Sequence, residues 1–105
     1  GTADQYIIKA DADLSRVANV AEQIKSSVGV MRRFTLGLSS TRVMCNIESA
    51  RLPNGGGSLV DVIRQLGLFQ AEVEENLDQI EGFCLKIQEN VESLGRSIKK
   101  IQGSK

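Results

Sequence analysis

Three carboxylates with helical spacing are the first candidates for chemistry in this sequence. Glu72, Glu75 and Asp78 recur every three residues, so a helix would present all three on one face. Such a face could hold a divalent cation, but di-metal sites in helical bundles take ligands from several helices, histidine among them. The sequence contains no histidine, which is also the commonest general base. We therefore predict a solvated acidic face, no metal or other cofactor, and no enzymatic activity.

A glycine-rich segment and two cysteines are the remaining candidates. Residues 54–58 read Asn-Gly-Gly-Gly-Ser and precede a helical pattern, as phosphate-binding loops do. A P-loop needs a lysine after its last glycine, and here Ser58 and Leu59 follow, so we interpret the segment as a turn. Cys45 and Cys84 lack metal-ligand spacing, and we interpret them as buried thiols in a reducing compartment.

The elements that would position these residues follow from one dominant pattern, an apolar stripe between Leu59 and Ile101. Steps of three or four residues separate its members, as in a coiled-coil seam. Two successive four-residue steps, Phe69–Val73–Leu77, form a stutter that we interpret as a packing accommodation, with a hinge as the alternative. The members are Leu59, Val62, Leu66, Phe69, Val73, Leu77, Ile80, Cys84, Ile87, Val91, Leu94, Ile98 and Ile101.

A second helical segment with the same period precedes the stripe. Its apolar residues are Ala10, Leu14, Val17, Ala21, Ile24, Val28 and Met31. Asp11 and Asp13 are candidate N-caps, so we predict a first arm at about residues 11–50. Residues 35–42 contain Gly37, serines and threonines that favour a break, which leaves residues 35–50 open between helix and loop.

The clearest turn lies at residues 52–58, where the only proline adjoins three glycines. We assign the hairpin turn to Pro53, Asn54, Gly55, Gly56 and Gly57, and a second arm to residues 58–102. The predicted fold is a single all-α domain over residues 1–105, an antiparallel, coiled-coil-like helical hairpin that forms part of a four-helix assembly.

The charges indicate the antiparallel register. In a hairpin centred near Gly55, residues whose numbers sum to about 110 are level with each other. Arg32 is then level with Asp78, and Asp11 is level with Lys99. Opposite charges therefore meet at both heights.

The sequence contains more apolar residues than one hairpin seam can bury. Residues beside the two stripes include Val20, Val30 and Leu36 in the first arm and Val60 in the second. We therefore predict a homo- or hetero-oligomer, formed with a protein partner. The candidate partner interface comprises Phe34, Leu38, Ile63, Leu68, Phe83 and Leu85.

Composition narrows the classes of partner and compartment. Thirteen basic and thirteen acidic residues cancel, which argues against a nucleic-acid partner. There is neither an apolar run long enough to span a membrane nor a secretory leader. We expect a cytoplasmic protein, or one exported without a cleaved signal peptide.

The first arm opens with Ile8-Lys9-Ala10-Asp11, followed by Leu14, Val17, Ala18 and Ile24. This opening resembles the N-terminal pattern of small WXG-type proteins and their LXG-associated relatives in type VII secretion systems. Those proteins are helical hairpins of about this length that act as secreted partners or as targeting partners of a larger toxin. The W-x-G turn is absent, and the end, Ile101 to Lys105, lacks the Tyr-x-x-x-Asp/Glu signal.

The resemblance implies a non-enzymatic, chaperone-like binding module that pairs with a larger helical effector domain. Its departures from the family pattern favour a co-targeted partner over a self-secreting member. The alternative is a self-assembling structural coiled coil or tether.

Overall fold

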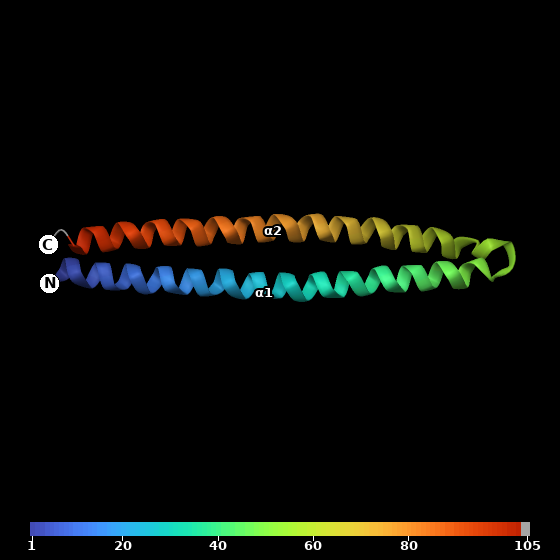
Figure 1. The fold of residues 1–105 in the computed structure, drawn as a ribbon, viewed down its shortest axis with the longest axis horizontal. Coiled ribbons are helices and arrows are strands. Elements are labelled where there is room, and N and C mark those ends of the chain that lie inside the picture. The colour runs from blue at the N-terminus through green and yellow to red at the C-terminus, as the bar shows by residue number, and fades with distance from the viewer. Residues whose placement is uncertain (104–105) are drawn as a thin grey trace. The chain divides into compact units, whose positions relative to one another are not determined.

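The structure, a computed structural model, describes residues 1–103 as an all-α helical hairpin (Figure 1). Helix α1 spans Thr2–Ala50, the short 3-10 turn η1 spans Pro53–Gly56, and helix α2 spans Ser58–Gly103. Residues 1–103 contain no strand. The predicted fold class is confirmed.

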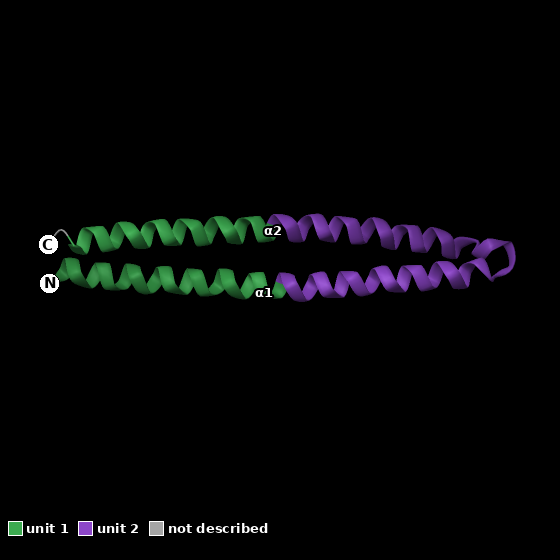
Figure 2. Cartoon of the chain, in the orientation of Figure 1, with its two compact units in different colours: residues 1–27, 80–105 green, residues 28–79 purple. Residues whose placement is uncertain are grey.

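The chain divides into two compact units, each built from both helices (Figure 2). Unit 1 comprises residues 1–27 and 80–105, and unit 2 comprises residues 28–79. In each unit a segment of α1 runs antiparallel to a segment of α2. The expected single domain over residues 1–105 stays a prediction.

Helix α1 begins nine residues earlier than the predicted first arm. Asp11 and Asp13 lie inside the helix and are not N-caps. Asp13 instead pairs with Lys9 and Arg16 of the same helix. Ile7 is half-buried, because the helical period of the apolar stripe extends back to it.

Residues 35–50, which the sequence left open, are helical. Thr35 Oγ1 donates to the Met31 carbonyl at 2.8 Å, and Thr41 Oγ1 donates to the Gly37 carbonyl at 3.1 Å. Both hydroxyls donate to a carbonyl one turn back along the helix, so each is satisfied while its residue stays helical. The expected break therefore does not occur.

The turn lies where the sequence placed it, between Ala50 and Ser58. Asn54 and the three glycines that follow all have positive φ, between 51° and 91°. Asparagine and glycine adopt this conformation at the lowest cost. A Cβ at Gly56 would lie 2.8 Å from the Ser49 Cβ, so Gly56 also permits the chain to return close to the end of α1.

In unit 1 the seam between the helices buries small side chains. Ala21 of α1 and Cys84 of α2 are almost fully buried. Polar contacts flank them, because the Gln88 amide donates to Glu22 at 2.9 Å and Lys25 Nζ donates to Gln88 Oε1 at 3.4 Å. These contacts join α1 to α2 in the predicted antiparallel register, in which paired residue numbers sum to about 110.

In unit 2 the register is confirmed by one ion pair, in which Arg32 donates to Asp78 at 2.8 Å. Val28, Ile63 and Leu77 form the apolar part of the seam. The same seam also buries polar side chains, as the next section describes.

Candidate protein-binding surface

Unit 2 has an open apolar groove of about 300 Å³, named here the unit-2 groove. Helix α1 contributes Val30, Met31, Phe34, Thr35 and Leu38, and helix α2 contributes Phe69 and Val73. The Phe34 side chain is 71% exposed and that of Phe69 is 57% exposed. Large, solvent-exposed aromatic residues beside an apolar hollow are typical of protein interfaces.

Polar residues take the place of these apolar side chains inside the seam. Thr35, Ser49 and Gln70 are the buried polar residues of the described chain, exposed by 2%, 4% and 6%. The Thr35 and Ser49 hydroxyls bond to backbone carbonyls of α1, so their burial leaves no donor unsatisfied. Unit 2 therefore buries polar groups while large apolar groups stay in water.

A side-chain network centred on Gln70 holds the two helices of unit 2 together. Arg42 Nη1 donates to Gln70 Oε1 at 2.9 Å, and Gln70 Nε2 donates to Ser39 Oγ. Arg42 lies across Gly67, where an added Cβ would come within 2.7 Å of the guanidinium. Arg42 Nε is buried without a hydrogen-bond partner. Gly67 thus provides the space that the Arg42 side chain occupies.

The seam keeps a seven-residue repeat, whereas the apolar stripe of α2 does not. The positions Ile63, Gln70, Leu77 and Cys84 are all buried and lie seven residues apart. Between the turn and the stutter at Phe69–Val73–Leu77, the apolar stripe departs from this repeat. In that part of α2 the stripe therefore lies on the flank of the helix. Phe69 lies in the groove for this reason, and Gln70 fills the seam position.

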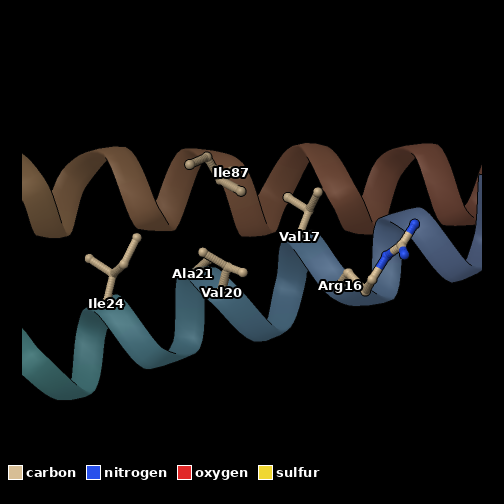
Figure 3. A pocket seen from close by; sticks show the side chains of 6 residues that line it. All are labelled: Arg16, Val17, Val20, Ala21, Ile24 and Ile87. Carbon is tan, nitrogen blue, oxygen red and sulfur yellow. The ribbon is translucent and has the colours of Figure 1, made fainter.

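Unit 1 carries a second apolar groove of about 230 Å³, the unit-1 groove (Figure 3). It is lined by Arg16, Val17, Val20, Ala21 and Ile24 from α1 and by Ile87 from α2. In Figure 3 Val17 and Ile24 point from α1 toward α2, Ile87 lies on α2, and Arg16 lies at one end of the row. The guanidinium of Arg16 pairs with Asp13, so a charged pair borders this groove.

Two further hollows are polar. One is lined by Arg32, Leu36, Glu74 and Asp78 and contains the ion pair of unit 2. The other is lined by Thr2, Gln5, Tyr6 and Lys9 at the start of α1. Neither offers the continuous apolar lining of the two grooves.

The predicted interface residues fall into three groups. Phe34 and Leu38 line the unit-2 groove. Leu68, Phe83 and Leu85 are exposed but do not line either groove. Ile63 is only 4% exposed and belongs to the seam, so its assignment to an open interface is corrected.

Several groove residues were assigned by the sequence to the seam instead. Met31, Phe69 and Val73 lie on the apolar stripes, which we expected the opposite arm to cover. The signal that could have revealed them is the stutter, since a shift of the stripe requires other residues to fill the seam.

The candidate catalytic and ligand-binding residues do not come together in a site. Within residues 1–103 no group of three or more cysteine and acidic side chains could hold a metal ion. Asp78 of the acidic face pairs with Arg32, as the register predicted. Cys84 is buried and Cys45 is half-buried, both as free thiols. Neither α1 nor α2, as far as residue 103, contains a stretch long and apolar enough to cross a bilayer.

No protein-family model matches the sequence, and comparison with curated proteins and with solved structures finds no significant match. The proposals below therefore depend on the two grooves and the seam.

Proposed function

We propose that this protein is a non-enzymatic helical binding module that pairs with a larger helical effector domain. One observation carries the proposal: apolar side chains of both helices line open grooves, while polar side chains occupy part of the seam. A hairpin whose only task was to fold would gain stability from the reverse arrangement, because each buried apolar side chain contributes about 1.5–3 kcal/mol.

The exposed area supports this proposal. The chain exposes 7895 Å² to solvent. A compact monomer of 11.4 kDa is expected to expose about 5,800 Å². The excess, about 2,100 Å², is larger than the roughly 800 Å² that one partner buries in a standard interface. There is thus enough additional surface for more than one protein contact.

The grooves suit an amphipathic helix. Val17, Val20 and Ile24 recur at helical spacing along one wall of the unit-1 groove, and Ile87 lies on the other. A partner helix that places apolar residues at the same spacing would enter such a groove with its polar face in water. The resemblance to type VII secretion hairpins implies pairing with a larger helical effector domain, and we propose an effector of that system as the partner.

We assign the unit-1 groove to this larger partner. Its apolar row is flanked by the Asp13–Arg16 pair, which offers both charge signs to a partner surface. Charged groups at the rim of an interface contribute more to partner selection than to affinity. The unit-1 groove therefore has the features of a site that selects a different protein.

Co-purification of this chain with the product of an adjacent gene tests the proposal. Val20 lines the unit-1 groove and is half-exposed, so Val20→Asp is expected to reduce recovery of the partner at least about tenfold. Ile8→Asp is the matched control, because Ile8 is an exposed β-branched residue of α1 outside the groove lining. Recovery of this chain alone, with the neighbour's product present, contradicts the proposal.

A further inference from the structure

We propose that unit 2 has a second packing, in which α1 and α2 turn about their own axes and close the unit-2 groove. The register of the two helices stays the same, and the polar side chains of the seam move out into water. We name the packing described above the open packing and the second one the closed packing. This inference goes beyond the pairing with an effector, which we assigned to the unit-1 groove, and does not depend on it.

The seam of the open packing is polar at positions that recur every seven residues. Thr35 and Ser49 of α1 and Gln70 of α2 are buried there. Arg42 lies seven residues from both Thr35 and Ser49, and its Nε atom is buried without a hydrogen-bond partner. A buried polar group stabilises a fold little even when it is hydrogen-bonded, and a buried donor without a partner destabilises it. The open packing is thus less stable than one with an apolar seam at these heights.

An apolar seam is available on the neighbouring flank of each helix. Leu38 follows Thr35 by three residues, and Val73 follows Gln70 by three residues. At 3.6 residues per turn, side chains three residues apart differ by about 60° around the helix axis. Leu38 and Val73 both line the unit-2 groove, so the two helices have to turn in opposite senses to bring them together. A turn of about 60° places both at the centre of the seam.

The closed packing requires no sliding of one helix along the other. Arg42 and Gln70 form a level pair in the seam of the open packing and are joined by a hydrogen bond. Two apolar pairs on the neighbouring flanks are level in the same register, since their residue numbers also sum to about 110. All four of their side chains are half-buried in the open packing. The pairs are Leu38 with Val73 and Cys45 with Leu66.

Opposing contributions balance the two packings. Closure moves the rings of Phe34 and Phe69, which are 71% and 57% exposed, toward the seam and removes part of their apolar surface from water. It also separates Arg32 from Asp78, but Asp78 is 70% exposed, and an ion pair in water contributes little. The hydrogen bonds of Gln70 are exchanged for bonds to water. Two packings of one sequence that differ by such a balance form a two-state element.

The ends of unit 2 have features that can absorb the rotation. Gly55, Gly56 and Gly57 follow one another in the turn, and glycine accepts more backbone conformations than any other residue. At the other end, the stutter Phe69–Val73–Leu77 is a place where the phase of a supercoil changes. Gly29 lies near the start of the α1 segment of unit 2 and lowers helix propensity there.

The second packing makes the unit-2 groove a regulated surface. A ligand that enters the groove binds only the open packing, so its apparent affinity is reduced by the fraction of the chain that is closed. An occupied groove in turn keeps Gln70 in the seam. The equilibrium between the two packings therefore controls whether unit 2 presents an apolar surface.

Acrylamide quenching of a single tryptophan tests the inference, because the native sequence contains no tryptophan. Phe34→Trp places the probe in the unit-2 groove. Phe83→Trp is the matched control, because Phe83 is 64% exposed and lines neither groove. Each probe is measured in the otherwise native chain and in two backgrounds that favour one packing each.

The two backgrounds change the polar pair of the seam. Arg42→Met combined with Gln70→Leu makes the seam of the open packing apolar and so favours the open packing. Gln70→Lys places a second cation beside Arg42 in that seam, whereas both cations are in water in the closed packing. Gln70→Lys therefore favours the closed packing.

We expect the quenching constant of the probe at residue 34 to be at least about twofold lower with Gln70→Lys than with Arg42→Met and Gln70→Leu, with the otherwise native chain between them. The control probe at residue 83 is expected to have the same constant in all three. Equal constants for the probe at residue 34 overturn the proposal. Shielding that disappears when the chain is diluted also overturns it, because association of separate chains then causes the shielding.

Circular dichroism shows whether every variant keeps its helices. If Gln70→Lys loses them, the otherwise native chain is compared with the Arg42→Met, Gln70→Leu chain alone. The probe at residue 34 is then expected to be less accessible to acrylamide in the native seam than in the apolar one. Equal accessibility in these two chains overturns the proposal.

Discussion

At the scale of single residues, glycine has two different roles in this chain. Gly56 has φ of +91° and lies against Ser49, whereas a Cβ at Gly82, inside α2, meets nothing within 4 Å. We expect Gly56→Ala to lower the free energy of unfolding by about 1–3 kcal/mol, because it adds a clash to an unfavourable backbone conformation. Gly82→Ala is expected to raise it by about 0.5–1 kcal/mol through helix propensity.

Urea unfolding of the two variants, followed by circular dichroism, measures this difference. Equal effects of the two substitutions would contradict the role assigned to the turn.

At the scale of the elements, the polar seam of unit 2 makes the two helices interdependent. Gln70→Leu removes the acceptor of Arg42 and leaves a partly buried guanidinium without it, so we expect a loss of about 1–3 kcal/mol in unfolding free energy. Arg42→Met combined with Gln70→Leu removes both partners. It is expected to be neutral or stabilising, because well-packed apolar residues often replace buried polar pairs without loss.

A double-mutant cycle from urea unfolding measures the coupling of Arg42 and Gln70. Additive losses in the double variant would show that the two side chains do not act as a unit.

The elements also show what the sequence could predict. The helices follow from the apolar period, the turn at Pro53–Gly57 from its glycine content, and the Arg32–Asp78 register from the matching of charges between the two arms. The break expected at residues 35–42 does not form, and the hydroxyls of Thr35 and Thr41 bond to carbonyls within the helix. Helix propensity alone does not predict where a hydroxyl finds its acceptor.

The candidate site was predictable only in part. Phe34 and Leu38 were identified as residues without a place in the seam, and they line the unit-2 groove. Ile63 was expected at the interface and is buried in the seam, whereas Phe69 was expected in the seam and is exposed. An apolar pattern indicates which residues avoid water but not which element covers them. Which residues of α2 enter the seam depends on how Arg42, Gly67 and Gln70 fit together across it. The pattern of a single helix cannot reveal this fit.

At the scale of the whole molecule, each of the two units presents one apolar groove, and we assigned the effector to the groove of unit 1. The zero net charge of the chain leaves no long-range repulsion toward a charged partner.

Binding of the effector also links stability to concentration. When only the folded chain binds, each tenfold increase in free effector above the dissociation constant adds about 1.4 kcal/mol to the apparent stability of this chain. We expect this dependence for the native chain and for the control variant Ile8→Asp.

Val20→Asp is expected to unfold at a midpoint that does not change with the concentration of effector, because a carboxylate in the unit-1 groove opposes binding of an apolar surface. Thermal unfolding of this chain over a hundredfold range of effector concentration measures both behaviours. Since apolar contact supplies most of the affinity, raising the salt concentration should lower the midpoint of the native chain only slightly. A midpoint that falls steeply with salt would instead indicate that the Asp13–Arg16 pair holds the effector.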